Sequence, residues 1–551
     1  MDYTTRMLSS PPKDPNSAVL IDADRPPRSI SWLEYASLTK RVAVGLRDIG
    51  LVEGDTVGLL SVNEIHYYVL GDGVIAAGAT FCPLPTTPLD QAGLFIEAAQ
   101  VNWLFVSPEF LTEILLAAPN WKIDKTRILV FDPPGGMTPY SGRLPRFSSL
   151  LSADESRWKN PYQGKDPKKL IAVRSFGSGT SGNIKAIDIS QAAQLARLDA
   201  PLFAPDPRDT AWLQNIGLSH VSSLNMCQQA CAGRLPMALT SVTDAPTFLD
   251  RIQAGSISQI QLSPAMMESM TETITSGLRS KDCLKSLSTV LVGGTFSRKV
   301  SVEEFMALLP SYTRVRTGYG STEAGIVSMT PIDTPWELGF CGVLTPKVEL
   351  KIIDIDTGKP LSIHDPGEIC VRTPEMMSGY CNNPTATAAT FLPDDDGKGP
   401  WLRTGDKGYI DPSNNQLVLH ARYIELIKIG KETILPVDVD EVLMTHPSLK
   451  RAAVTSVVAR DDELDLEIIA YVIRKEGASL TAQEVVDFAA TKLPKHCVPI
   501  GGVIFTDDFP RSFAGKVQRR NLIHCPVLEG SARQLSISKT PVDKSSFGNF
   551  H

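Results

Sequence analysis

The sequence lacks any stretch of apolar residues long enough to cross a membrane, and its first residues, MDYTTRMLSSPPKDPNS, contain no apolar core of a signal peptide. Its last residues, FGNFH, are not a peroxisomal address of the Ser-Lys-Leu type. These absences argue against a membrane span, against secretion and against import into peroxisomes. We therefore expect a cytoplasmic protein.

Basic residues and paired cysteines are also scarce. Lysine and arginine number 54 against 61 aspartates and glutamates, so the net charge is −7, and no long basic run interrupts this balance. Without a basic field, we expect no nucleic-acid partner. The 9 cysteines form no C-x-x-C pair and the 8 histidines do not lie beside them at ligand spacing, which favours buried free thiols over a metal site.

The length and the composition predict a globular protein with more than one domain. The chain has 551 residues, of which 42% are hydrophobic and 21% charged, so it is too long for one core and too apolar to be disordered. Helical and strand patterns alternate past residue 300, which predicts an α/β fold with largely parallel sheets. Ser31 and Glu34, for example, form a capping-box pattern before an amphipathic helix that ends at Gly50.

The pattern changes along the C-terminal half of the chain. Strands separated by turns between Val348 and Val371 predict a β-rich subdomain that completes the large domain. Short strands and helices after about Arg422 predict a small, mobile α+β domain. The Ser/Lys-rich end of the chain predicts an unfolded tail. We therefore expect a large domain over 1–421, a small C-terminal lid over 422–529 and a tail over 530–551.

The stretch SFGSGTSGNIKA, from Ser175 to Ala186, is the most distinctive local feature. Gly177 and Gly182 have the glycine spacing of a Walker loop, but Lys185 comes late and the following KAIDIS reads as a strand instead of a helix. Its glycines and hydroxyl groups still suit a nest of N–H groups that binds phosphate. Taken alone, the loop could equally be a surface turn.

Other segments support the phosphate-binding interpretation. The loop resembles the T-S-G-T-T-G-x-P-K-G signature of the adenylate-forming superfamily, which includes acyl-CoA synthetases, adenylation domains of peptide synthetases and luciferases. Five further segments match the family's order between about Ser31 and Leu522: TGYGSTEAG, GEICVRTPEMMSGY, WLRTGD, ARYIELIKIGKETILP and FPRSFAGKVQRRNL. The motif pattern is most similar to that of acyl-CoA or coumarate:CoA ligase-like members. The resemblance implies that ATP and Mg²⁺ activate a carboxylic acid to an acyl-adenylate, which then passes to CoA.

The resemblance also assigns residues to the phosphates and the metal. Thr322 would contact the α-phosphate, Glu323 would bind magnesium, and Lys516 would bridge the acyl carboxylate and the α-phosphate as charge develops. Judged alone, Glu323 could be a capping or ion-paired carboxylate and Lys516 a solvated surface lysine. The β- and γ-phosphates would be held by Ser178, Gly179, Thr180, Ser181, Gly182 and Lys185.

A second group would hold the nucleoside and the acyl chain. Tyr319 would stack on adenine, although it could be a core aromatic, and Asp406 would accept hydrogen bonds from the ribose, although it could be a turn residue. The other nucleotide-binding residues would be Gly318, Arg422 and Lys428. The acyl pocket would be lined by His220, Gly293, Gly294, Thr295 and Gly320.

The substrate is only partly constrained by these residues. His220 is equally suited to a structural role. Amino-acid-activating members place an aspartate in the segment around His220, and GLSHVSS has none, which favours an acid without an α-amino group.

The predicted hinge departs from the family pattern. Ile424 stands where a charged hinge residue is usual, and Gly430 and Lys431 reverse the usual Lys-Gly order beside the pantetheine tunnel. Transfer to CoA is therefore one hypothesis, and transfer to an amine or to a carrier-protein thiol in trans is a second. A third is a nucleotide-binding homologue without catalysis. Against the third stands the joint retention of Thr322, Glu323, Asp406, Arg422 and Lys516.

Overall fold

The computed structural model describes residues 1–533 except 122, 137, 178–183, 201–209, 234, 295–297, 394–395, 459–465 and 513–515. The chain divides into two compact units: Met1–Thr404 with Gly408–Leu419, and Gly405–Lys407 with the chain from His420 onward. The predicted boundary between residues 421 and 422 stays a prediction, and most of the predicted tail lies outside the described residues. No helix in the described part is both long and apolar enough to cross a bilayer.

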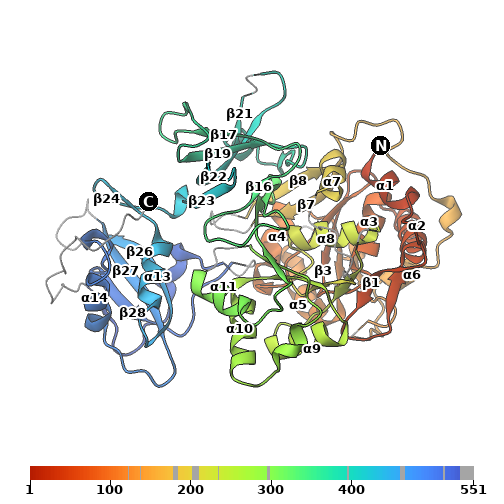
Figure 1. Ribbon diagram of the computed structural model, residues 1–551. Helices are drawn as coiled ribbons and strands as arrows, with labels where there is room; N and C mark the ends of the chain where they lie inside the picture. Colours follow the sequence, from red (N-terminus) through yellow and green to blue (C-terminus); the bar gives the residue numbers. More distant parts are fainter. Residues whose placement is uncertain are drawn as a thin grey trace. The chain divides into compact units, whose positions relative to one another are not determined.

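The first unit contains two mixed sheets of mainly parallel strands with helices between them, which confirms the expected α/β class (Figure 1). The first sheet has the order β13 (Arg314–Arg316), β12 (Thr289–Val292), β11 (Gln259–Leu262), β9 (Trp212–Gln214), β10 (Met237–Leu239), β1 (Ala18–Asp22) and β2 (Ser29–Ser31). The second has the order β20 (Gly379–Tyr380), β8 (Ala186–Ser190), β7 (Ile171–Phe176), β4 (Thr80–Pro83), β3 (Thr56–Leu60), β5 (Trp103–Val106) and β6 (Ile128–Val130).

Several helices of this unit begin at a residue whose side chain caps the helix, such as Ser31 before α2 (Trp32–Asp48) and Ser190 before α7 (Gln191–Leu198). Helix α2 starts with the predicted capping box of Ser31 and Glu34, and it packs against α3 (Tyr67–Ala76). Gly73 permits this approach, because a Cβ there would lie 2.4 Å from Val42 Cγ1. The remaining α-helices are α1 (Tyr3–Ser9), α4 (Ala92–Ala98), α5 (Leu111–Ala117), α6 (Phe147–Leu150), α8 (Val221–Cys231), α9 (Ala245–Ala254), α10 (Pro264–Thr275), α11 (Lys299–Met306) and α12 (Pro384–Thr390).

Two antiparallel sheets make up the expected β-rich part. One contains β14 (Gly318–Ser321), β15 (Gly325–Met329) and β16 (Val343–Leu344). The other has the order β18 (Pro360–Leu361), β17 (Glu349–Ile353), β19 (Gly367–Arg372), β22 (Trp401–Ile410) and β21 (Phe391–Leu392), with β23 (Leu417–Arg422) paired to β22.

The second unit has an apolar core of its own and is drawn mainly in blue in Figure 1. Its hairpin of β24 (Ile427–Ile429) and β25 (Glu432–Ile434) precedes α13 (Pro436–Met444). Its sheet has the order β26 (Leu449–Val458), β27 (Leu466–Arg474), β28 (Gly502–Phe505) and β29 (Ala532–Arg533), and α14 (Ala482–Ala490) lies between β27 and β28 in the chain. Strand β29 follows Gly530, where the sequence predicts that the tail begins. All 9 cysteines are free thiols, and 8 of them are buried, as expected, whereas Cys341 is partly exposed.

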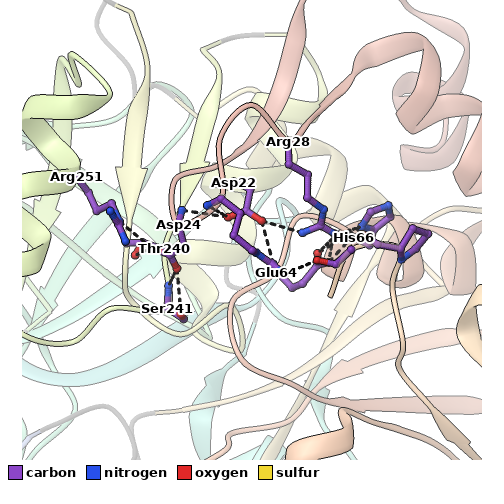
Figure 2. A network of polar contacts seen from close by, with 11 residues as sticks. Asp22, Asp24, Arg28, Glu64, His66, Thr240, Ser241 and Arg251 are labelled. Carbon is purple, nitrogen blue, oxygen red and sulfur yellow. Dashed lines mark hydrogen bonds and ion pairs between the residues drawn. The ribbon is translucent and has the colours of Figure 1, made fainter. Parts of the chain in front are cut away.

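A polar network joins the loops of the two seven-stranded sheets (Figure 2). Arg28 Nη1 donates to Asp22 Oδ2 at 2.8 Å, at the end of β1, and its second amino group pairs with Glu64, which follows β3. Asp24 forms an ion pair with Arg251 on α9, with Nε and Oδ1 3.0 Å apart. Because these charges are satisfied by one another, we interpret the network as a structural joint between the sheets.

Asp72 on α3 is a buried carboxylate. It accepts hydrogen bonds from the hydroxyl groups of Tyr3, at 2.8 Å, and Tyr35, and from Gln228 Nε2 at 3.1 Å. Burial outweighs these three donors and raises the pKa of Asp72 to about 6. The folded state therefore binds the proton of Asp72 more tightly than the unfolded state does.

We expect the stability of the protein relative to the Asp72→Asn variant to fall with pH. The contribution of the protonated carboxyl is complete below about pH 4 and is lost as the pH rises through about 6, by at most about 3 kcal/mol. Thermal unfolding of both proteins between pH 4 and pH 8 measures this difference. A difference that stays constant, or that grows in favour of the wild type as the pH rises, contradicts the assignment.

Candidate active site

The phosphate-loop motif connects two strands, as the sequence predicts. Phe176, the last residue of β7, pairs with Ala186, the first residue of β8, and the two strands are antiparallel. No helix follows the loop directly, so a Walker site is excluded by the geometry. Gly177 and Lys185 are described at the two ends of the loop. Five of the assigned residues lie outside the described residues: Ser178, Gly179, Thr180, Ser181 and Gly182.

The turn that carries Thr322 and Glu323 lies directly against the start of this loop. Thr322 is buried, and its hydroxyl group donates to the carbonyl oxygen of Phe176 at 3.2 Å. A Cβ on Gly177 would lie only 3.3 Å from Glu323 Oε1. The structure therefore brings together three predicted features: the first residue of the loop, the residue assigned to the α-phosphate and the residue assigned to the metal.

The β14–β15 hairpin explains the two glycines around Tyr319. A Cβ on Gly320 would lie 2.4 Å from the carbonyl oxygen of Gly325, and one on Gly318 would lie 2.9 Å from the carbonyl oxygen of Ser328. The pairing register shifts between Tyr319 and Gly320. Packing within the hairpin therefore already requires both glycines, independently of any ligand. Tyr319 is 9% exposed.

Arg197 on α7 is a residue of the site that the sequence analysis did not identify. Its side chain is completely buried, and its Nη2 donates to the carbonyl oxygens of Thr322, at 2.9 Å, and Glu375, at 2.8 Å. Burial lowers its pKa to about 10, while Glu375 and Glu323 favour the charged form. In the sequence, Arg197 lies on the same face of this helix as the apolar residues Ala193 and Leu198, and this position is the signal that its side chain is buried.

Glu375 fixes the same turn from a second direction. Its Oε2 accepts a hydrogen bond from the backbone N–H of Ile326 at 3.0 Å, just after the turn. Two residues further on, the N–H of Met377 donates to the carbonyl oxygen of Glu323 at 2.8 Å. The segment of residues 375–377 and Arg197 together hold the backbone of the Thr322–Glu323 turn on both sides.

Lys185 and Glu323 both contact Tyr380 on β20. Lys185 Nζ lies 5.0 Å from the centroid of the tyrosine ring, which is within the range of a cation–π interaction. The hydroxyl group of Tyr380 donates to Glu323 Oε1 at 3.2 Å. Tyr380 ends the motif GEICVRTPEMMSGY, but the family resemblance assigns no role to this residue.

The two residues predicted at the ribose also lie together. Asp406, within β22, is buried, and its Oδ1 forms an ion pair with Arg422 Nε at 2.9 Å. Arg422 is the last residue of β23. Gly405, immediately before the aspartate, has φ of +72°, which favours glycine at that position.

Lys516 and the hinge residues lie on the second unit. The N–H of Lys516 donates to Ser512 Oγ at 3.3 Å, and the N–H of Ser512 donates to the carbonyl oxygen of Lys516 at 2.8 Å. Lys428 is exposed on β24, and Ile424 is 50% exposed. Gly430 and Lys431 form the turn of the β24–β25 hairpin, in which Ile429 pairs with Glu432.

The residues assigned to the acyl pocket follow strands of the first sheet. His220 follows β9 and caps α8, because its Nδ1 accepts from the N–H of Ser222 at 3.2 Å. Gly293 and Gly294 follow β12, and a Cβ on either would meet no atom within 4 Å. The carboxyl ends of parallel strands share one edge of a sheet, so the two segments lie at the same edge. Thr295 lies outside the described residues.

The site suits a magnesium ion that binds together with phosphate groups. In the described part of the chain, no three Cys, His, Asp or Glu side chains are grouped as a metal cage. Magnesium usually binds one or two protein carboxylates and completes its shell with phosphate oxygens and water. The carboxylate of Glu323, beside the first residue of the phosphate loop, fits that requirement.

Family models match most of the chain. Residues 9–381 match the model of the AMP-binding enzyme, and residues 438–516 match the AMP-binding enzyme C-terminal domain. A phenylacetyl-CoA ligase of Aspergillus niger is 30% identical over 509 residues, which cover 92% of this chain and 93% of that protein. A 4-coumarate–CoA ligase of Oryza sativa subsp. japonica is 28% identical over 509 residues, with coverage of 90% and 89%.

Solved structures of low sequence identity share the fold. An amide bond synthetase from Marinactinospora thermotolerans aligns with a TM-score of 0.78 at 23% identity and covers 94% of this chain and 98% of its own. An O-succinylbenzoate Coenzyme A synthetase from Bacillus subtilis, in complex with ATP and magnesium, aligns with a TM-score of 0.76 at 21% identity, with coverage of 95% and 99%. Both alignments extend over nearly the full length of the chain.

We expect Arg197→Gln to reduce the free energy of unfolding by about 2 kcal/mol, because the shorter side chain leaves the carbonyl oxygens of Thr322 and Glu375 without their donor. Denaturation in urea measures the change. Arg157→Gln is the matched control, because Arg157 forms an exposed ion pair with Asp48 and its loss should have little effect. Equal stability of Arg197→Gln and the wild type contradicts the structural role of Arg197.

Proposed function

The chain belongs to the AMP-binding enzyme family, and on that premise we propose that it is an acid:CoA ligase that forms AMP. It activates a carboxylic acid with ATP, releases pyrophosphate and transfers the acyl group to the thiol of CoA. The observation that carries the proposal is the docking of the Thr322–Glu323 turn against Gly177 at the start of the phosphate loop. The names of the two relatives, both CoA ligases of aryl-containing acids, support the same reaction.

The first step needs positive charge around the phosphates. A carboxylate oxygen of the substrate attacks the α-phosphorus, and the bond from this phosphorus to the leaving pyrophosphate breaks. Repulsion between the anions opposes the attack. Lys185 and the loop before it hold the leaving phosphates, and Glu323 holds magnesium, which neutralises phosphate charge when bound. Lys516 approaches the attacking carboxylate and the α-phosphate.

Thr322 has to change its hydrogen bond to serve the α-phosphate. Its hydroxyl group has a single proton, and this proton is donated to the carbonyl oxygen of Phe176. A phosphate oxygen offers no proton, so it needs the same donor. We therefore infer that the hydroxyl group of Thr322 rotates from Phe176 towards ATP when the nucleotide binds. The carbonyl oxygen of Phe176 holds the hydroxyl group of Thr322 at the start of the phosphate loop.

In this proposal, residues from two separate segments of the chain bind the nucleoside. Tyr319 presents the adenine-stacking ring with Gly318, and Asp406 accepts hydrogen bonds from the ribose hydroxyl groups. Arg422 orients the Asp406 carboxylate through their ion pair, so that Oδ2 lies in a fixed direction. Lys428 adds a positive charge for the nucleotide on the neighbouring hairpin.

The acyl group occupies the edge of the first sheet. His220, Gly293, Gly294, Thr295 and Gly320 line its pocket in this proposal. The open space beside Gly293 and Gly294 supports a pocket wall formed by backbone. Because Nδ1 of His220 already caps α8, the histidine would face the acyl group with the other side of its ring. The acid itself lacks an α-amino group.

CoA is the acceptor that the relatives favour. The amide bond synthetase shares the fold, so an amine is the second candidate, and a carrier protein in trans is the third. In this proposal Lys431, beside Gly430 at the hairpin turn, would lie near the pantetheine arm of CoA. A cytoplasmic location stays a prediction of the sequence.

Pyrophosphate release with a panel of acids tests the proposal. The panel contains phenylacetate, 4-coumarate and straight-chain fatty acids, each with ATP and magnesium, without CoA, with CoA or with an amine. Release that CoA stimulates, together with a thioester product, supports the proposal. Acyl-adenylate that accumulates without stimulation by CoA, or amide formation, supports the second candidate. If no acid supports release at any magnesium concentration, the protein is not an adenylating enzyme.

We expect Lys516→Ala to slow adenylation by about a hundredfold or more, which is the usual effect of removing one group that stabilises transition-state charge. Transfer to CoA from supplied acyl-adenylate should be nearly unchanged, because Lys516 acts in the first step. Single-turnover assays of the two steps measure both rates, and Lys450→Ala is the control for an exposed lysine of the same unit. An equal loss in both steps contradicts the assigned role.

A further inference from the structure

Tyr380 lies between two groups of opposite charge that the proposed function assigns to the phosphates and the metal. The face of its ring meets the ammonium group of Lys185, with Nζ 5.0 Å from the ring centroid. Its hydroxyl group donates to Glu323 Oε1 at 3.2 Å. The two contacts use different parts of one side chain, so substitutions can separate them.

Backbone pairing explains why the ring lies beside Lys185. Strand β20 pairs with β8, and Tyr380 stands opposite Ile187, two residues after Lys185. Hydrogen bonds flank this pair on both sides: Ser378 N–H donates to the carbonyl oxygen of Asp188 at 2.7 Å, and Cys381 N–H donates to that of Ala186 at 2.8 Å. The strand that follows the phosphate loop therefore fixes the position of Tyr380.

The same segment is also attached to Glu323. Met377 N–H donates to the carbonyl oxygen of Glu323 at 2.8 Å, three residues before Tyr380. Thr387 on α12 accepts from the N–H of Tyr380 through its Oγ1 at 2.9 Å. Gly379 has φ of +152°, and a Cβ there would lie 2.9 Å from Thr387 Cγ2, so glycine is required before the tyrosine.

A lysine and a glutamate at this distance from a common neighbour are expected to attract each other. A direct ion pair would neutralise both groups and compete with phosphate for the lysine and with magnesium for the glutamate. In the described part of the chain, no ion pair joins Lys185 to Glu323. The ring face attracts a cation without carrying a negative charge, and the hydroxyl group orients one carboxylate oxygen while the carboxylate stays charged.

We propose that Tyr380 is a positioning residue for ATP and magnesium, which keeps Lys185 and Glu323 apart and holds each ready for its ligand. The inference rests on the proposed function, because that function assigns Lys185 to the phosphates and Glu323 to the metal. It adds a residue to which the motif resemblance gave no role. It also assigns separate tasks to the ring and to the hydroxyl group.

The Tyr380→Phe variant tests the hydroxyl group. Calorimetric titration with ATP at increasing magnesium concentrations measures binding without any need for catalysis. We expect the magnesium concentration that produces half of the gain in ATP affinity to rise about tenfold, as for other residues that orient a metal ligand. ATP affinity in EDTA should stay at the wild-type value, because the ring still faces Lys185. An unchanged magnesium dependence overturns the role of the hydroxyl group.

The Tyr380→Leu variant tests the ring. Without the aromatic face, Lys185 is free to pair with Glu323, so ATP affinity in EDTA should fall about fivefold in addition to the magnesium effect. In the Glu323→Gln background, Lys185 has no carboxylate to pair with, and Tyr380→Leu should then have little effect on ATP affinity in EDTA. An equal loss in both backgrounds indicates a merely structural role and overturns the proposal.

Controls separate folding and function from the inference. Tyr312→Phe removes a hydroxyl group that bonds to the carbonyl oxygen of Lys285 on the surface, and it should bind ATP like the wild type. Circular dichroism checks each variant, and if Tyr380→Leu does not fold, the magnesium titration of Tyr380→Phe decides alone. A wild type that binds ATP but releases no pyrophosphate with any acid refutes the proposed function, whereas the binding titrations still decide the role of Tyr380.

Discussion

The buried guanidinium group of Arg197 is the interaction on which the geometry of the site depends. One nitrogen donates to the carbonyl oxygens of Thr322 and Glu375, which belong to segments more than fifty residues apart in the chain. Burying a cation is costly, and its pKa is lowered to about 10 accordingly. Carbonyl oxygens and nearby carboxylates partly offset that cost. Through these two hydrogen bonds, Arg197 connects α7 with both the Thr322–Glu323 turn and the 375–377 segment.

The local structure was largely predictable from the sequence, whereas this joint was not. The capping box of Ser31 and Glu34 and the strand after the phosphate loop are local signals, and the structure confirms both. Local signals also predicted the change to a β-rich part near Val348. Arg197 and Tyr380 matter through residues that are remote in sequence. No periodicity or spacing in the sequence indicates a contact of that kind, so neither residue was predictable.

The glycines of TGYGSTEAG show how a correct motif can suggest an incomplete reason. A glycine on each side of Tyr319 would by itself suggest that the backbone approaches a ligand closely there. In the structure, both positions are already closed by the neighbouring strand, since any Cβ would meet backbone atoms of β15 at 2.4 to 2.9 Å. The hairpin needs these glycines in order to form. Only the folded hairpin places Tyr319 and Thr322 on the two sides of the register shift between Tyr319 and Gly320. Folding and binding therefore constrain the same residues, and a motif alone does not separate the two.

The reversed order of Gly430 and Lys431 has a physical explanation in the hairpin turn. Gly430 has φ of +57°, in the left-handed region that favours glycine, whereas Lys431 is not among the residues with positive φ. A lysine at position 430 would have to adopt that left-handed conformation. The sequence thus places glycine at the position where this two-residue turn requires it, and the departure from the family pattern is accommodated locally. It follows that the β24–β25 turn accommodates the exchanged order of Gly430 and Lys431 without backbone strain.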